Sequence, residues 1–320
     1  MAHVQTVLGQ IAPETLGVTL PHEHTQIALW HIAGRWDYWQ LSRDQEVLLE
    51  ELALFRESGG SSFVDLTLPG VGRDPAWLVD VSRASGLNVV MGCGWYRGAH
   101  YPPEALIDRR SVEDLADELV AEATDGVEPG DGGERVRPGI IGEIGTDKPW
   151  LSALEERVHR AAARASRRTG LAITTHGVMS DVALAQLQVF EDEGADLSRV
   201  VIGHADSYPS LDHYLEIVRR GANLEFDFLG MSFSVLERHG EGLVIGLIRE
   251  LLSRGHVDRI LLSQDVCHDS QLVHYGGNGY AYLAASFLPR LREAGVSDAE
   301  IETITVANPS RILTIGQGSS

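Results

Sequence analysis

Residues 17–24 of the chain read GVTLPHEH, and this stretch sets the interpretation of the whole sequence. The run Gly17–Leu20 is short and apolar, as expected for a buried β-strand, and His22 and His24 follow it at once. In an extended chain residues i and i+2 point to the same side, so both imidazoles can face one direction.

A β-rich run followed by a longer amphipathic segment recurs along the rest of the chain. After 17–20, strands are expected at 62–66, 88–93, 139–144, 171–175, 200–203, 223–226 and 260–262. Helices are expected at 44–57, 74–84, 111–124, 150–168, 181–193, 211–220, 236–254 and 280–293. Eight such units predict an α/β fold, a (β/α)8 TIM barrel. The alternative, an open doubly wound sheet, is disfavoured because no glycine-rich phosphate turn follows the first strand.

The length of 320 residues suits a single barrel domain over 1–320. Residues 125–133 are expected to form a surface loop, 297–313 a terminal pair of helices on the barrel, and 316–320 a frayed tail.

Composition limits the partners and the compartment. The net charge of −20 argues against nucleic acid and anionic membranes and leaves a small-molecule substrate, although solubility alone also explains much of the acid excess. The two cysteines, Cys93 and Cys267, fit a reducing cytoplasm better than a secreted scaffold. No signal peptide is expected from residues 1–14, and no run approaches the length of a transmembrane helix.

Six residues of metal-binding type lie just past the ends of five expected strands: His22, His24, Glu143, His176, His204 and Asp265. The carboxyl ends of parallel barrel strands share one face, where the active sites of such barrels are built. Four imidazoles and two carboxylates are more than one tetrahedral site needs, so the set predicts two divalent ions at this face. Zn²⁺ is expected, with Mn²⁺ or Co²⁺ as alternatives.

Each of these residues also has an ordinary interpretation when it is taken alone. A lone histidine is more often a core or loop residue, Glu143 could pair with an arginine, and Asp265 could cap a helix. The placement of the whole set at strand ends makes the metal site the more specific hypothesis.

The sequence resembles the phosphotriesterase-like family of the amidohydrolase superfamily, in its glutamate-bridged branch of phosphotriesterase homology proteins. The similarity runs from LGQIAPETLGVTLPHEH at 8–24 to ANPSRIL at 307–313. Between them lie IIGEIGTD at 140–147, TTHG at 174–177, VVIGHAD at 200–206 and ILLSQD at 260–265.

The resemblance implies a role for each residue. His22, His24 and Asp265 would hold the more buried ion, His176 and His204 the more exposed one, and Glu143 would bridge them. Many relatives bridge with a carboxylated lysine, so the glutamate is a departure. The resemblance also implies a homodimer.

A second departure concerns a proton relay. Some members carry an acid three residues after the sixth-strand histidine, where this chain has Ser207, with Asp206 before it. The relay is therefore not expected in its usual form, and phosphotriester hydrolysis is expected to be weak or promiscuous.

Four residues in the loops after the third and seventh strands are expected to bind substrate: Trp95, Tyr96, Arg97 and Phe228. An equally weighted alternative is that the aromatic members only pack these loops. By resemblance, Tyr96 occupies the position where lactonase relatives place a tyrosine near the substrate carbonyl. Arg73 and Arg97 are the cations that could meet a negatively charged substrate.

The function expected from these features is hydrolysis. A hydroxide bridging two metal ions would attack a lactone or carboxylic ester, and Asp265 would act as the catalytic acid–base. The alternatives are an amide or N-acyl hydrolase or a promiscuous phosphotriesterase and, in another class, a non-catalytic barrel that only binds a metal or ligand.

Overall fold

The structure is a computed structural model that describes residues 2–32, 39–130, 132–231 and 240–316. Eight parallel strands form its main sheet, in the order β12-β11-β10-β9-β8-β7-β6-β3. Their bounds are β3 Thr19–Glu23, β6 Ser62–Asp65, β7 Asn88–Cys93, β8 Ile140–Gly145, β9 Ile173–His176, β10 Val200–Ile202, β11 Asn223–Phe226 and β12 Ile260–Leu262. The expected (β/α)8 barrel is confirmed, and each predicted strand overlaps an observed one.

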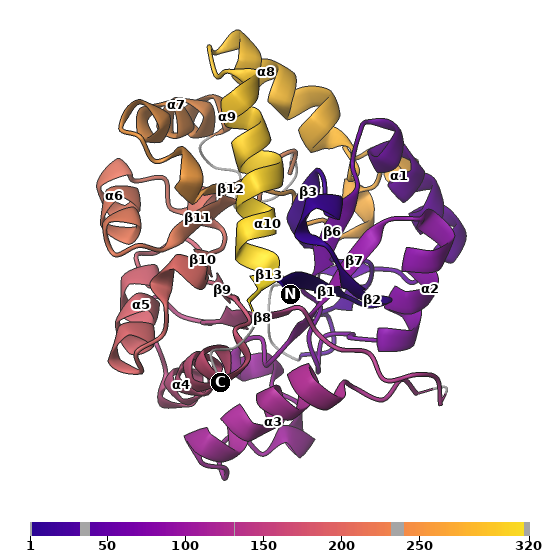
Figure 1. Cartoon of the computed structure of the whole chain (residues 1–320), viewed down its shortest axis with the longest axis vertical. Coiled ribbons are helices and arrows are strands. Elements are labelled where there is room, and N and C mark those ends of the chain that lie inside the picture. Colours follow the sequence, from indigo (N-terminus) through magenta and orange to yellow (C-terminus); the bar gives the residue numbers. More distant parts are fainter. Residues whose placement is uncertain (1, 33–38, 131, 232–239, 317–320) are drawn as a thin grey trace.

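Helices surround the sheet in the expected alternation (Figure 1). They are α1 Gln45–Glu57, α2 Pro75–Ser85, α3 Val112–Asp125, α4 Ala153–Thr169, α5 Ala183–Asp192, α6 Leu211–Arg219, α7 Gly240–Ser253, α8 Leu288–Glu293, α9 Asp298–Glu302 and α10 Asn308–Leu313. Residues 236–239 of one predicted helix, and 317–320 of the predicted tail, lie outside the described residues. Side chains of Asp44, Asp74, Ser111 and Ser152 cap the amino ends of α1 to α4 by accepting backbone N–H groups.

The terminal segment differs from its prediction. Residues 298–313 form one unbroken helical run, because a π-helical stretch, Thr303–Ala307, joins α9 to α10. Another π-helical stretch, Leu283–Phe287, precedes α8. Each stretch is followed by a proline, Pro289 or Pro309, in the first turn of the next helix. A wider turn leaves room for a proline, whose ring and missing N–H would otherwise interrupt the helix.

Within the described part of the chain, five short strands lie outside the barrel sheet. An antiparallel sheet joins both ends of the chain in the order β13-β1-β2, with bounds Thr314–Ile315, His3–Thr6 and Gly9–Ile11. A second antiparallel pair joins β4 (Ile27–Ala28) to β5 (Gln40–Leu41). Neither antiparallel sheet was expected from the sequence patterns.

The barrel interior is filled at the end opposite the predicted site. Val64, Val90, Ile140, Val201 and Leu261 of five barrel strands form a buried cluster there, and residues of β1 and α10 join it. Figure 1 shows α10 crossing this end of the barrel beside β1 and β13. A larger core cluster packs the outer face of the strands against the helices. No helix among the described residues is long and apolar enough to span a membrane.

Two irregularities in strand register occur where the candidate ligands lie. Pairing of β3 with β6 shifts between Leu20 and Glu23, and pairing of β8 with β9 shifts between Ile141 and Ile144. His22 and Glu143 fall inside these two intervals. Irregularities of this kind change the direction of a side chain and are common next to active sites.

Candidate metal centre

The structure brings all six predicted metal-binding residues together at the carboxyl ends of the barrel strands. His22, His24 and Asp265 have potential ligand atoms within 4.8 Å of one another, and so do Glu143, His176 and His204. All six residues are buried. The chain therefore places two adjacent groups, each able to hold a cation, on the face where the sequence predicted them.

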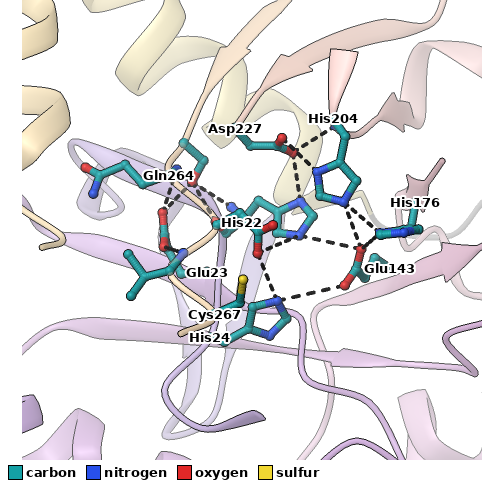
Figure 2. A network of polar contacts seen from close by, with 12 residues as sticks. His22, Glu23, His24, Glu143, His176, His204, Asp227, Gln264 and Cys267 are labelled. Carbon is teal, nitrogen blue, oxygen red and sulfur yellow. Dashed lines mark hydrogen bonds and ion pairs between the residues drawn. The ribbon is translucent and has the colours of Figure 1, made fainter. Parts of the chain in front are cut away.

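Glu143 lies between the two groups (Figure 2). Its Oε2 is 2.9 Å from His176 Nδ1, 3.4 Å from His204 Nε2 and 3.6 Å from His22 Nε2. Its Oε1 is 3.8 Å from His24 Nε2. One carboxylate thus reaches imidazoles of both groups, the position that a bridging ligand requires.

Outer hydrogen bonds fix three of the imidazoles through their Nδ1 atoms. His22 Nδ1 lies 3.0 Å from Asp227 Oδ2 and 3.2 Å from Glu225 Oε2, and His204 Nδ1 lies 2.8 Å from Asp227 Oδ1. His24 Nδ1 lies 2.9 Å from Thr67 Oγ1.

With Nδ1 held in this way, Nε2 of each ring faces Glu143 or Asp265. The buried Nε2 of His22 has no hydrogen-bond partner among the described residues. Holding one ring nitrogen from outside while the other faces inward is the usual arrangement of a metal-bound histidine. The side chains present therefore fit a metal centre.

Buried carboxylates raise the pKa of two histidines in this cluster. Burial lowers the pKa of His22, but the charges of Asp227 and Glu143 outweigh it and hold that pKa well above its usual range. Burial also lowers the pKa of His204, but the charge of Asp227 outweighs this effect and raises that pKa to about 10. Burial favours protonation of Glu143, yet His176 and His22 hold its pKa well below its usual range. A divalent cation would supply the same positive charge and displace the imidazole protons.

Glu23 stabilises the site although its side chain points away from the candidate ligands. Adjacent residues of a strand point to opposite sides, so Glu23 points away from His22 and His24 toward β12, the other end of the sheet order. Its carboxylate accepts hydrogen bonds from Ser263 Oγ at 2.8 Å and from Gln264 N and Val266 N, both at 2.9 Å. The carboxylate thereby fixes the loop that carries Asp265.

Four residues around the cluster were not predicted from the sequence: Glu23, Thr67, Glu225 and Asp227. A signal for the last two exists in NLEFDF at 223–228, where acids alternate with apolar residues within and just past a buried strand. Acids at this spacing face one side of the strand and need a buried partner.

A pocket opens beside the cluster, and three of the four predicted substrate-binding residues line it. Tyr96, Arg97 and Phe228 share this lining with candidate ligands and with Ile27, Leu29, Trp39, Val178, Met231 and Cys267. Trp95 is instead buried in the hydrophobic core and is not among the lining residues that the structure describes. A larger hollow beside β1 and β2 contains none of the candidate ligands.

Tyr96 and Phe228 of the pocket contact candidate ligand imidazoles directly. Tyr96 Oη lies 3.4 Å from His176 Nδ1, and burial raises the pKa of the Tyr96 hydroxyl well above its usual range, so it stays a proton donor. The Phe228 ring stacks on His204 with a centroid distance of 4.6 Å.

The two arginines singled out in the sequence have different surroundings. Arg73 donates to both oxygens of Glu122, at 2.6 and 2.9 Å, and is not among the described residues that line the pocket. Arg97 lines the pocket and places its guanidinium carbon 4.6 Å from the ring centroid of Tyr96.

The residues at the expected relay position contact backbone instead. Asp206 accepts hydrogen bonds from Phe228 N at 2.9 Å and Asp227 N at 3.4 Å, and burial raises its pKa to about 8. Ser207 Oγ accepts from Met179 N at 3.0 Å. Both residues therefore position the loops after β9 to β11.

Comparison with known proteins gives consistent results. The model of the phosphotriesterase family matches residues 2–313. The chain is 36% identical to the phosphotriesterase homology protein of Escherichia coli, over 92% of this chain and 97% of that protein. It is also 36% identical to the N-acetyltaurine hydrolase of Dictyostelium discoideum, over 85% of this chain and 74% of that protein. A lactonase structure from Listeria monocytogenes superposes with a TM-score of 0.89 at 27% identity, covering 98% of this chain and 100% of that one.

Proposed function

Because the chain belongs to the phosphotriesterase family, whose members are metal-dependent hydrolases, we propose that it hydrolyses an N-acyl bond with two divalent ions. The observation that carries the proposal is the position of Glu143 between two groups of ligand-type side chains. Relatives named N-acetyltaurine hydrolase, which cleave an amide, favour an N-acyl substrate over the lactone or ester expected first from the sequence.

In the proposed site, His22, His24 and Asp265 would hold one ion, His176 and His204 would hold the other, and Glu143 would be shared between them. Four imidazoles and two carboxylates suit Zn²⁺, with Mn²⁺ and Co²⁺ as alternatives. Ions bound in such a site polarise a carbonyl and lower the pKa of water, so that hydroxide is available at neutral pH.

Asp265 is the proposed proton carrier. Its Oδ1 lies 3.2 Å from His24 Nε2, and the residue belongs to both the candidate ligand set and the pocket lining. A carboxylate in this place accepts the proton of the attacking water and delivers it to the departing amine nitrogen, which leaves poorly as an anion.

Tyr96 and the apolar lining are proposed to orient the acyl group. The protonated Tyr96 hydroxyl, beside His176, can donate a hydrogen bond to the substrate carbonyl oxygen. Phe228 and Met231 supply an apolar wall for the acyl chain. Trp95 stays a predicted substrate-binding residue, although it is buried in the core and is not among the described residues that line the pocket.

Hydrolysis of a lactone or carboxylic ester is the second candidate. The lactonase of Listeria monocytogenes has the same fold over nearly the whole of both chains. The same attack on an acyl carbon serves both substrate types, which differ in the basicity of the leaving group.

The test is a substrate panel on the purified protein loaded with Zn²⁺ or with Mn²⁺. N-acyl amines, esters, lactones and one phosphotriester are compared by kcat/KM, alongside metal content per chain. The expected result is two ions per chain, as family resemblance implies, and the highest kcat/KM for an N-acyl amine. A higher value for lactones would select the second candidate, and a chain that binds no metal would overturn both.

We further propose a cytoplasmic homodimer. Cys93 and Cys267 are both buried and unbridged, as is usual in a reducing compartment. The dimer rests on family resemblance, and light scattering on the eluting chain measures it directly.

A further inference from the structure

A hollow lies at the end of the barrel opposite the metal cluster, where α10 crosses the barrel (Figure 1). It has a volume of about 310 Å³, and the described residues that line it are Asp196, Ser198, Arg199, Asp258, Arg259 and Arg311. We propose that its three arginines bind the phosphate group of a small phosphorylated metabolite. The proposal is independent of the proposed function, because no lining residue belongs to the metal cluster or to the pocket beside it.

Two of the arginines occupy the same place in two units of the barrel. Arg199 ends the 3-10 turn Leu197–Arg199 directly before β10, and Arg259 ends the turn Val257–Arg259 directly before β12. In the sheet, β11 lies between β10 and β12. The repeated pattern of the barrel therefore places the two cations on either side of the start of one strand.

Arg311 of α10 joins both turns. It donates to Ser198 O at 3.2 Å and to Asp258 O at 2.6 Å, which are the carbonyls of the middle residue of each turn. It also donates to Asn223 Oδ1 at 2.9 Å, at the start of β11. Two turns and one helix thus hold the three guanidinium groups around a single hollow. Cations that are held in place lose little freedom when an anion binds, which favours affinity.

The other two arginines also donate hydrogen bonds to backbone carbonyls. Arg199 donates to Ile312 O at 3.0 Å and to Thr314 O at 2.9 Å, and Arg259 donates to Gly221 O at 2.7 Å. The buried Nε of Arg199 has no hydrogen-bond partner among the described residues. A guanidinium has five N–H donors and keeps its charge in proteins, so these bonds leave donors and charge for a ligand.

The two aspartates of the lining reduce the positive charge without removing it. Asp196 Oδ1 accepts from Ser198 N at 3.0 Å and from Ser198 Oγ at 2.7 Å. Asp258 Oδ2 lies 3.6 Å from Arg259 Nε, which exceeds a normal hydrogen-bond length. Three guanidinium groups and two carboxylates leave an excess of one positive charge in a chain whose net charge is −20.

Phosphate matches this arrangement better than a carboxylate does. Burial, and next the charge of Arg259, lowers the pKa of Arg311, and burial lowers the pKa of Arg199. An anion that contacts all three arginines would offset both effects. A phosphate monoester carries about two negative charges near pH 7 and presents three acceptor oxygens, whereas a carboxylate has one charge and two oxygens. Phosphate can therefore contact more of the guanidinium groups at once.

The size of the hollow favours a small ligand. Sites for small molecules range from about 300 to 1,000 Å³, and 310 Å³ lies at the lower end of this range. The alternative is a purely structural role, in which the arginines only attach α10 to the two turns. That role predicts no selective binding of an anion, so a binding measurement distinguishes the two.

The experiment measures by calorimetry the Kd of three compounds that share one sugar ring, on the metal-loaded chain. These are glucose 6-phosphate, glucuronate and glucose, which carry a phosphate, a carboxylate or a hydroxyl at the same end of the ring. Wild type should bind glucose 6-phosphate about 10- to 100-fold more tightly than glucose, the effect of charge-assisted hydrogen bonds. It should also bind glucose 6-phosphate more tightly than glucuronate.

Arg259→Gln is the test variant, because Arg259 makes a single hydrogen bond to the described residues. It should raise the Kd for glucose 6-phosphate by about 10- to 100-fold. Arg254→Gln is the matched control, since Arg254 is close in sequence, 47% exposed, hydrogen-bonded to Glu250 and absent from the described lining. It should leave the Kd unchanged. Thermal unfolding without ligand checks that each variant is folded, and Arg311→Gln replaces Arg259→Gln if that variant does not fold.

Equal Kd values for glucose 6-phosphate in wild type and Arg259→Gln would overturn the site, because binding at the proposed metal ions does not depend on this arginine. An equal effect of Arg254→Gln would also overturn it, and so would equal binding of glucose 6-phosphate and glucose by wild type. Binding of glucuronate as tight as that of glucose 6-phosphate would overturn the choice of phosphate. No turnover is measured, so failure of the proposed hydrolysis leaves the result intact.

Discussion

The carboxylate of Glu23 holds the backbone on both sides of Asp265. Gln264 N and Val266 N each donate to it at 2.9 Å, while Asp265 itself has φ of 45° and donates its N–H to His22 O at 3.2 Å. A left-handed conformation is unfavourable for a residue other than glycine and persists only where its surroundings impose it. These contacts join β3 to the segment after β12, the two ends of the barrel sheet.

Glu23→Gln should weaken both the fold and the metal site. A glutamine has one acceptor oxygen, so its NH2 group would face a backbone N–H of residue 264 or 266. An unsatisfied buried donor costs about 1–3 kcal/mol, and the loop would no longer hold Asp265 in place. Thermal unfolding and metal content per chain measure the two effects. Glu57→Gln, at an exposed position, is the control, and a variant at position 23 with wild-type metal content would contradict the positioning role.

Asp227→Asn should lower the affinity for both ions at once. Asp227 accepts from the Nδ1 atoms of His22 and His204, which belong to different ligand groups. Loss of such an outer contact reduces metal affinity by about 10- to 100-fold. Thr67→Val is the matched variant, since Thr67 contacts only His24 among the candidate ligands, and it should weaken one ion. Titration with a competing chelator resolves the two ions, and selective loss of a single ion in Asp227→Asn would count against a shared role.

Asp265→Asn should retain metal but lose turnover. The amide keeps one oxygen toward His24 but cannot accept and return a proton near neutral pH. A positioned acid–base contributes about 10²- to 10⁴-fold, so kcat should fall by that factor. Metal content is measured on the same sample. Near wild-type kcat with metal bound would exclude Asp265 as the proton carrier.

His159→Leu should make the fold less sensitive to acid. His159 is fully buried in α4, stacks on Phe190, and burial lowers its pKa to about 4. The unfolded chain takes up this proton near pH 6.5 and the folded chain only near pH 4, so wild-type stability falls as pH drops through that interval. The loss attributable to His159 is on the order of 3 kcal/mol.

The measurement for His159→Leu is the free energy of unfolding in urea at several pH values between 7 and 4. Subtracting the variant from wild type removes the titration of other groups. A difference that stays constant over this interval would show that His159 does not contribute to acid sensitivity.

The eight strands and six candidate ligands could be predicted because the barrel repeats one local pattern. Each strand is a short apolar run, and topology alone brings the strand ends together, so the positions of His176 and His204 implied that they would meet. The family motifs supported the same set.

The outer contacts could not be predicted in the same way. Which carboxylate holds which imidazole depends on side-chain direction across neighbouring strands, as for Asp227 with His22 and His204. The unbroken terminal helix also escaped prediction, because a proline at 309 ordinarily marks a helix boundary. Trp95 was grouped with Tyr96 and Arg97 because all three follow the third strand, yet Trp95 is buried in the core and, unlike the other two, is not among the described residues that line the pocket.

Asp227 also limits which substitutions evolution can accept at this site. Its carboxylate contacts a histidine of each candidate ligand group, so a substitution at this position is expected to weaken both proposed ions together. Evolution of an enzyme with a single ion is therefore expected to start from a substitution at another position. Thr67 is an example, because among the candidate ligands it contacts only His24.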